Sequence, residues 1–136
     1  MRLYLDACAN IYAIESVPPF RNQVVARIAP AEGTVDGLII TSQLSRLECR
    51  VKPLREGNAE LLAKYDEFFT RRLVRVAEIT ARVIEQATEL RARYGFKTPD
   101  AIHLATAIEE RADLFLTGDG DLARCAEVKV EVLEPS

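Results

Sequence analysis

Runs of mostly apolar residues, separated by helical patterns, constrain the fold of this chain more than any other feature. Such runs occupy residues 3–5, 38–41 and 114–117. A strand that is apolar at successive positions is buried on both faces, as in a parallel sheet covered by helices. Because helical patterns lie between these runs, we predict an α/β fold: a three-layer α/β/α sandwich around a mainly parallel sheet. The 136 residues fit one domain, and we assign residues 1–136 to it.

Two further segments are predicted to be strands at the edges of the sheet. Residues 73–76 are typical of an exposed or edge strand, and residues 128–132 alternate between apolar and polar side chains, as a closing edge strand does. Helical patterns fill the intervals. They run from Ala7 to the pair Pro18-Pro19, from Phe20 to about Ile28, from Ser42 to near Val51, from Asn58 through Phe69, from about Thr80 to Tyr94, and from Thr98 through Ile108.

Capping and breaking residues define the expected ends of the first helices. Ser42 and Asn58 are good N-caps, because their side chains can accept hydrogen bonds from free backbone N–H groups. Pro30 and the turn-prone pair Glu32-Gly33 are expected to stop the second helix. Pro53 is expected to lie in the connection that follows the third helix.

The last two helices are separated by a short segment with strong signals. Gly95 is suited to the left-handed position after a helix. Thr98 and Pro99 are expected as the N-cap and the first residue of the next helix, with Asp100 in its first turn.

Composition and charge exclude several classes of protein. The formal net charge is −3, from 18 Lys and Arg against 21 Asp and Glu, so the chain is not expected to coat nucleic acid by bulk charge. No apolar run approaches the roughly 20 residues needed to span a bilayer. Asp6 comes too early for a signal peptide, so we expect a cytoplasmic protein. The 3 cysteines have no Cys-x-x-Cys spacing, which favours buried thiols over disulfides or a zinc site.

Acids lie where an α/β protein places its functional edge. Asp6 and Asp119 follow two predicted strands, Asp100 opens a helix, Glu48 lies within a helix, and Asp121 follows closely after Asp119. Because ligands bind beyond the carboxyl ends of the strands in such sheets, we expect these side chains to converge. A pocket of like charges requires a cation or protonated acids. Carboxylate oxygens suit Mg²⁺ or Mn²⁺, and the chain offers no convincing Ser or Cys nucleophile, so we predict a metal-dependent site.

Each acid also has a purely structural interpretation. Asp6 is a suitable helix N-cap, Glu48 has arginines nearby for a surface ion pair, and Asp100 complements a helix dipole. Residues 118–121 are equally typical of a turn. His103 is the only histidine and shares a helix face with Asp100, and we favour a packing or hydrogen-bonding role for it over a catalytic one.

Four segments of the chain together match the motifs of a known family. The first is Tyr4-Leu5-Asp6 followed by Ile11-Tyr12, and the second runs from Thr41-Ser42 through Leu47-Glu48 to Pro53-Leu54-Arg55. The third and most specific is residues 98–107, and the fourth is residues 116–122. On these motifs the chain resembles the PIN-domain nucleases over essentially its whole length, and most closely the VapC-like toxins of prokaryotic toxin–antitoxin pairs.

The resemblance implies a set of roles and partners. It implies that Asp6, Glu48, Asp100 and Asp119 are catalytic and bind Mg²⁺ or Mn²⁺. It further implies that Asp121 is an auxiliary metal-binding acid and that the Thr117 hydroxyl supports the site. It implies cleavage of RNA, neutralisation by a cognate antitoxin, and a homodimer.

The chain differs from many members of that family at three positions. Cys8 stands where many relatives carry Ser or Asn, and Gly118 and Gly120 replace larger residues of the fourth motif. A non-catalytic module that keeps the fold and binds a protein or RNA partner is the main alternative to a nuclease. A phosphate-transfer switch is a weaker one, because only Asp6 follows the first strand.

The basic residues of the second motif have two interpretations. Arg46, Arg50 and Arg55 lie near the expected mouth of the site, where they would bind RNA phosphates or the acids of an antitoxin. Alternatively they form a solvated helix face with local ion pairs, which contribute little to stability.

Overall fold

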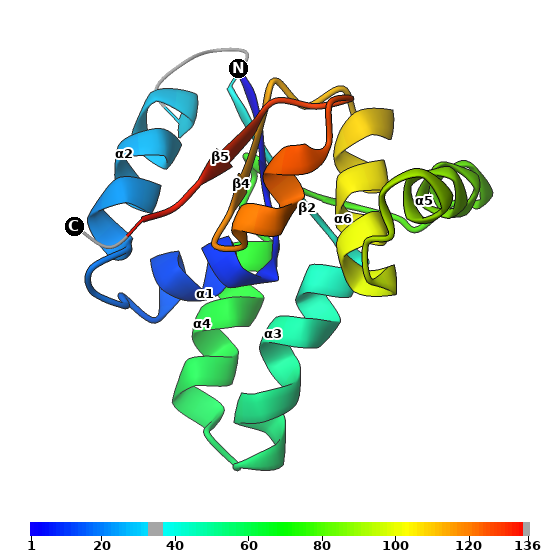
Figure 1. The fold of residues 1–136 in the computed structure, drawn as a ribbon. Coiled ribbons are helices and arrows are strands. Elements are labelled where there is room, and N and C mark those ends of the chain that lie inside the picture. The colour runs from blue at the N-terminus through cyan, green and yellow to red at the C-terminus, as the bar shows by residue number, and fades with distance from the viewer. Residues whose placement is uncertain (33–36, 135–136) are drawn as a thin grey trace.

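A parallel sheet with helices on both faces organises the chain (Figure 1). The computed structural model describes residues 1–32 and 37–134. The strands are β1 (Arg2–Leu5), β2 (Leu38–Ser42), β3 (Val74–Ala77), β4 (Leu114–Thr117) and β5 (Val130–Val132). The helices are α1 (Ala7–Ile14), α2 (Arg21–Glu32), α3 (Gln43–Arg55), α4 (Ala59–Phe69), α5 (Ala81–Tyr94), α6 (Thr98–Glu109) and the short 3-10 helix η1 (Gly120–Arg124).

The sheet has the strand order β3-β2-β1-β4-β5, and all of its neighbouring strands are parallel. The predicted α/β fold is therefore confirmed, and so are the two predicted edge strands, since β3 and β5 form the two borders. The central strand β1 lies between β2 and β4, with Tyr4 beside Ile40 on one side and Phe115 on the other. The chain builds β2 and β3 on one side of β1 and returns for β4 and β5 on the other, so the strand order reverses between β1 and β4.

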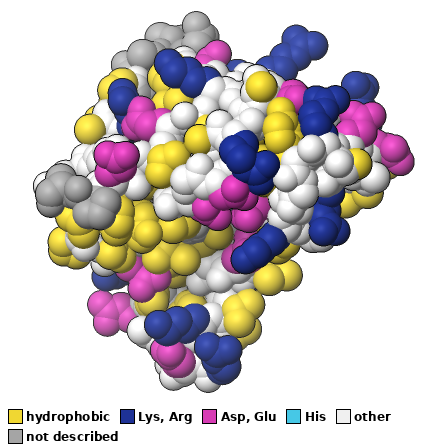
Figure 2. Space-filling model, viewed as in Figure 1, with side chains coloured by type: hydrophobic (Ala, Val, Ile, Leu, Met, Phe, Trp, Pro, Cys, Tyr) yellow, Lys and Arg dark blue, Asp and Glu magenta, His cyan; other side chains and the backbone are white. Residues whose placement is uncertain are grey.

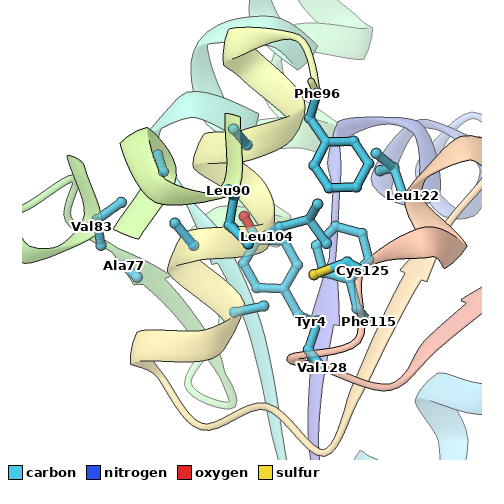
Figure 3. Close-up of a cluster of buried hydrophobic side chains, with 14 of the residues drawn as sticks. Tyr4, Ala77, Val83, Leu90, Phe96, Leu104, Phe115, Leu122, Cys125 and Val128 are labelled. Carbon is cyan, nitrogen blue, oxygen red and sulfur yellow. The ribbon is translucent and has the colours of Figure 1, made fainter. Parts of the chain in front are cut away.

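Alternate residues of the central strands pack into two separate cores, which explains why their sequences are apolar at successive positions. Tyr4, Ile40 and Phe115 face α5 and α6 in the core that Figure 3 shows. The rings of Tyr4 and Phe115 are stacked with centroids 5.0 Å apart. Leu3 and Leu5 point to the opposite face, where side chains of α1, α2 and α4 cover them. Both faces of the sheet are thus buried, as a doubly covered parallel sheet requires.

Three of the predicted capping residues, Ser42, Asn58 and Gly95, are confirmed. The Ser42 hydroxyl accepts a hydrogen bond from the Ser45 N–H (3.2 Å), and the Asn58 amide oxygen accepts one from the Leu61 N–H (3.1 Å). Gly95 follows α5 in the left-handed conformation, with a φ of 75°. An L-residue with a Cβ would be strained there, so the glycine stabilises the turn between α5 and α6.

The predicted effect of two prolines was wrong. Helix α2 continues through Pro30 to Glu32, and α3 continues through Pro53 to Arg55. Each proline lies in the last turn of its helix, where it removes its own N–H but leaves later residues able to bond upstream carbonyls. The Glu56 N–H, for example, still donates to the Lys52 carbonyl at 3.0 Å. Gly33, predicted to form the turn after α2, lies outside the described residues.

Two other helix ends also differ from expectation. Helix α1 ends at Ile14, before the pair Pro18-Pro19, and Ser16 then adopts a positive φ of 54°. Helix α6 begins one residue early: Thr98 is its first residue, and the N-cap is Lys97, which makes no side-chain capping bond. Since Pro99 tolerates the first two helical positions equally well, its presence did not fix the start to one residue.

The elements that follow the strands meet at one edge of the sheet. Helices α1 and α3 and the 3-10 helix η1 begin directly after β1, β2 and β4, at the carboxyl ends of these strands. Helix α6 precedes β4, so its first turn lies at the same edge, near the top of α3 in Figure 1. Helices α3 and α4 extend beyond this edge as a pair (Figure 1). Among the described residues, no helix is both long and apolar enough to cross a membrane.

Candidate active site

Asp6 is the most buried acid at the carboxyl edge of the sheet. It follows β1 directly and caps α1, with Oδ1 accepting the Ala9 N–H at 2.9 Å. Asp6 is only 6% exposed to solvent. Burial raises the pKa of this carboxyl above its ordinary value, and the negative charge of Glu48 acts in the same direction. Hydrogen bonds from Thr117 and Ala9 and the nearby His103 oppose that rise without cancelling it.

Asp100 is brought to Asp6 by the first turn of α6. Burial raises the pKa of Asp100, and the negative charges of Asp119 and Asp6 raise it further. His103 and Lys97 act in the opposite direction. The two acids are 94 positions apart in the sequence, yet the charge of Asp6 acts on Asp100.

Asp119 lies at the exposed side of the same group of acids. It caps η1, and its Oδ1 accepts the Asp121 N–H at 2.9 Å. Its own N–H donates to the Thr117 hydroxyl oxygen at 3.0 Å. Because the Thr117 side chain also bonds Asp6, this buried threonine links the ends of β1 and β4.

Glu48, on α3, is hydrogen-bonded to His103, the only histidine of the chain. Its Oε1 lies 2.7 Å from His103 Nε2, and the other ring nitrogen, Nδ1, lies 2.8 Å from the Tyr4 hydroxyl. The Glu48 side chain is 33% exposed, whereas His103 is almost fully buried. The predicted hydrogen-bonding role of His103 is therefore what the structure shows.

The Asp121 carboxylate is paired with Arg124. Both of its carboxylate oxygens accept hydrogen bonds from Arg124, at 2.7 and 3.0 Å. This contact lowers the pKa of Asp121, as expected for an exposed acid beside a guanidinium. Among the second-motif arginines, Arg50 forms a local ion pair with Asp66 at 2.8 Å, which fits the solvated-face interpretation for that residue.

The acids interact electrostatically without forming a closed cage. Within residues 1–32 and 37–134, no group of three or more His, Cys, Asp or Glu side chains is arranged to hold a metal ion. The chemistry of the group nevertheless suits a hard divalent ion, because its oxygen donors are carboxylates whose mutual repulsion a cation would relieve. Figure 2 shows acidic side chains gathered near the middle of this face, with basic side chains above and below them.

Cys8 and Gly118, two of the positions that differ from many relatives, contact each other beside the acids. A Cβ placed on Gly118 would lie 2.7 Å from Cys8 Sγ and 3.2 Å from the Tyr12 ring. Burial raises the pKa of the Cys8 thiol, and the charges of Asp6 and Asp119 raise it further. A neutral, half-buried thiol is a poor nucleophile, so Cys8 acts here as a packing group.

The polar contacts beneath the acids were not predicted from the sequence. The Asn10 side chain donates to the Thr41 hydroxyl oxygen (3.0 Å), and that hydroxyl donates to the Leu5 carbonyl (2.8 Å). These fully buried groups tie α1 to the ends of β1 and β2. The sequence signal for these contacts was Asn10, a polar residue on a short apolar helix. The corresponding signal for the His103 contact was Tyr4, which carries a hydroxyl in the central strand.

Comparisons with known proteins agree with this fold. The model of the PIN domain family matches residues 3–128 of the chain. No curated protein matches it. One chain of VapBC2 from Rickettsia felis, solved with a DNA fragment from its promoter, superposes with a TM-score of 0.78 at 18% identity, covering 98% of this chain and 100% of that chain.

Two further solved structures are similar over nearly their whole length. A toxin–antitoxin complex from Klebsiella pneumoniae gives a TM-score of 0.76 at 20% identity, covering 98% of this chain and 99% of that chain. VapC20 from Mycobacterium tuberculosis, a toxin that cleaves the sarcin–ricin loop, gives 0.72 at 18% identity, covering 93% and 98%. At these identities the likeness establishes the shared fold.

The close contact between Gly118 and Cys8 predicts a steric coupling. We expect Gly118→Ala to lower the free energy of unfolding by about 1–3 kcal/mol, because the new Cβ overlaps Cys8 Sγ. Adding Cys8→Ala should recover part of that loss. The matched control is Gly120→Ala, where no atom lies within 4 Å of the new Cβ. Urea unfolding measures all four proteins, and equal effects of Gly118→Ala and Gly120→Ala would contradict the contact.

The raised pKa of Asp6 predicts a pH-dependent gain in stability when its charge is removed. A carboxyl whose pKa is raised by folding binds its proton more tightly in the native state, so native stability falls as the pH rises from the ordinary value of about 3.9. Asp6→Asn keeps the helix cap and should therefore stabilise the chelator-treated protein at pH 7. The gain should vanish near pH 3, where Asp6 is protonated in both states.

A second Asp→Asn change provides the control for that measurement. Asp66 is partly exposed and pairs with Arg50, so Asp66→Asn should change the unfolding free energy at pH 7 by less than about 1 kcal/mol, and not upward. Urea titrations at pH 7 and pH 3 compare the two variants. If the Asp6→Asn protein is less stable than wild type at pH 7 without metal, the Asp6 charge does not destabilise the native state and the prediction is wrong.

Proposed function

The chain belongs to the PIN domain family, and from this membership we propose that it is a metal-dependent endoribonuclease acting as the toxin of a toxin–antitoxin pair. The observation that carries the proposal is the electrostatic coupling of Asp6, Asp100, Asp119 and Glu48 at the carboxyl edge of the sheet. Asp6 and Asp119 flank the point between β1 and β4 where the strand order reverses. In open α/β sheets this is the place where ligands bind.

The same acids are the proposed ligands of Mg²⁺ or Mn²⁺. Asp6, Glu48, Asp100 and Asp119 would hold the ion, some of them through water, and Asp121 would assist after leaving Arg124. When bound, the ion supplies positive charge that polarises the phosphodiester and favours deprotonation of water. The chain itself fixes two of these carboxylates: Ala9 and Thr117 orient Asp6, and His103 orients Glu48.

RNA is the proposed substrate, and basic residues near the mouth would position it. The positive charge of Lys97 acts directly on Asp100, so Lys97 lies close enough to guide a phosphate toward the acids. Arg46 and Arg55 are further candidates for phosphate contacts, whereas Arg50 is engaged by Asp66. RNA brings a polyanion to an acidic pocket, which requires a cation between them. The protein would act in the cytoplasm, where such RNA is found.

An antitoxin is the proposed protein partner. Two of the similar structures are described as a VapBC pair on promoter DNA and as a toxin–antitoxin complex, which supports a partner of this kind. A groove of about 390 Å³ between α1, α2 and α4 offers a place for it. Its lining includes the apolar residues Ile14, Val25 and Ile28. Three basic residues, Arg21, Lys64 and Arg71, line it together with one acid, Glu67, so an apolar segment with acidic residues would fit.

The ribonuclease proposal predicts the effect of neutralising one acid. Asp100→Asn should reduce Mn²⁺-dependent cleavage of RNA by roughly a hundredfold or more, because the ion loses a charged ligand while the first turn of α6 keeps its shape. The control is Glu85→Gln, which neutralises an exposed acid on α5. A gel assay with radiolabelled RNA, with and without chelator, measures both.

The outcomes separate the nuclease from the interaction module. Cleavage by Asp100→Asn at the wild-type rate would reject the assignment of the site. A wild-type protein that binds Mn²⁺ and RNA yet leaves the RNA intact would favour a non-catalytic module.

The homodimer that the family resemblance implies has a candidate contact on α3. Leu47, Val51 and Leu54 are 58%, 46% and 65% exposed, and their spacing places them on one face of the helix. A second copy would present the same apolar stripe, as a two-fold symmetric interface requires. Single apolar side chains are common on surfaces, but a stripe of three on one projecting helix favours a contact.

The stripe predicts the effect of a charge at its most exposed residue. Leu54→Glu should convert a dimer into a monomer, because it would bury a charge against its symmetry mate. Ile84→Glu introduces the same charge at an exposed apolar position of α5 and should leave the dimer intact. Light scattering during size-exclusion chromatography gives the mass. A Leu54→Glu dimer, or a monomeric wild type, would refute this interface.

A further inference from the structure

A buried hydrogen-bonded chain connects the centre of the sheet to the candidate site. Tyr4 lies in the middle strand, fully buried, with its hydroxyl oxygen directed toward α6 in Figure 3. The hydroxyl lies 2.8 Å from His103 Nδ1, and His103 Nε2 lies 2.7 Å from Glu48 Oε1. The chain therefore links β1, α6 and α3 through a single imidazole ring.

The hydrogen-bonding capacity of the end groups limits their roles in this chain. Burial raises the pKa of the Tyr4 phenol, so the hydroxyl keeps its proton, and hydrogen bonds with Ser42 and Ser45 oppose that rise without cancelling it. At the other end, a carboxylate can only accept, so the contact with Glu48 requires the N–H on Nε2.

We infer that His103 is a positioning residue: held by Tyr4 at Nδ1, it donates the Nε2 proton to Glu48 and fixes that carboxylate at the edge of the site. The inference deepens the proposed function and rests on it for the role of Glu48 as a metal ligand. The ring is buried and anchored at both nitrogens, whereas the Glu48 side chain is one-third exposed and makes no other hydrogen bond to a described residue.

The consequence is that a central strand, rather than a loop, determines where Glu48 lies. Helix α3 extends beyond the sheet, and a long glutamate side chain on it would otherwise sample several rotamers in water. Hydrogen bonds behind metal-binding carboxylates typically change metal affinity or activity by roughly 10- to 100-fold when they are removed. His103 and Tyr4 are placed to have that effect on Glu48.

The only histidine of the chain makes the proton arrangement directly measurable. Long-range ¹H–¹⁵N spectra of tag-free, ¹⁵N-labelled protein at pH 7 without metal report both ring nitrogens of one residue. We expect a proton on Nε2, where Glu48 accepts it, and an Nδ1 resonance shifted by its hydrogen bond to Tyr4. Tyr4→Phe should move the Nδ1 resonance toward the value of a nitrogen without a hydrogen bond. An Nε2 without a proton in the wild type would overturn the inference.

A matched variant separates positioning from general loss of a buried hydroxyl. Tyr65 is also fully buried, and its hydroxyl donates to Glu15 rather than to the histidine. Tyr65→Phe should therefore leave the His103 resonances and the Mn²⁺ affinity unchanged. Tyr4→Phe should weaken Mn²⁺ binding, measured by calorimetry, by roughly tenfold. Equal Mn²⁺ affinities of the two variants would contradict the inference.

Variants of the histidine provide a rescue test. His103→Leu removes the donor to Glu48 and should weaken Mn²⁺ binding by roughly 10- to 100-fold. His103→Gln places an amide N–H near the position of Nε2 and should restore part of that loss. A His103→Leu protein that binds Mn²⁺ as the wild type does would overturn the positioning role.

The spectra with the Mn²⁺ affinities test the positioning of Glu48, and the RNA assay tests the nuclease proposal, so each can be contradicted without the other. If the wild type cuts no RNA but the ring nitrogens and the Mn²⁺ affinity respond as expected, the nuclease proposal fails and the positioning of Glu48 stands. If RNA is cut but Tyr4→Phe changes neither measurement, the positioning fails and the nuclease proposal stands.

Discussion

The repulsion between carboxylates that the fold brings to one edge of the sheet is the constraint on which the rest of this structure depends. Asp6 must follow β1 to cap α1, and its burial there raises its pKa. Asp100 lies in the first turn of α6, and Asp119 precedes η1. Their negative charges add to the repulsion at this edge. A fold that tolerates such a group without a partner for its charge gives up stability, and exchange of stability for function is typical of active sites. The two hydrophobic cores on either side of the sheet stabilise the fold and offset the repulsion between these acids.

The support beneath the acids is built from rigid elements. Thr117 joins Asp6 to the loop of Asp119, and the Thr41 hydroxyl joins α1 to β1 and β2. Tyr4 packs against Phe115 in the core and at the same time orients His103. One central strand thus contributes to the core with its rings and to the site with its hydroxyl, which couples the packing of the sheet to the position of Glu48.

Much of the fold was predictable from local patterns, because strand burial and helix capping depend on neighbouring residues. The consecutive apolar runs gave the central strands, and Ser42 and Asn58 cap the helices as expected. Helix ends near Pro30 and Pro53 were not predictable, since a proline in a last turn removes a single bond. The meeting of acids at the carboxyl edge was predictable from the sequence, but its geometry was not: the His103–Glu48 contact spans 55 residues, and the pairing of Asp121 with Arg124 depends on how η1 turns.

The central claim is that the acids at the carboxyl edge share a divalent cation. The most direct measurement is anomalous diffraction at the manganese edge from crystals of the wild-type protein grown with Mn²⁺. We predict one or two anomalous peaks between Asp6, Asp100 and Asp119, within direct or water-mediated reach of Glu48. Manganese bound only at other acids, such as those of α5, or no peak at this edge with the four carboxylates ordered, would contradict the account.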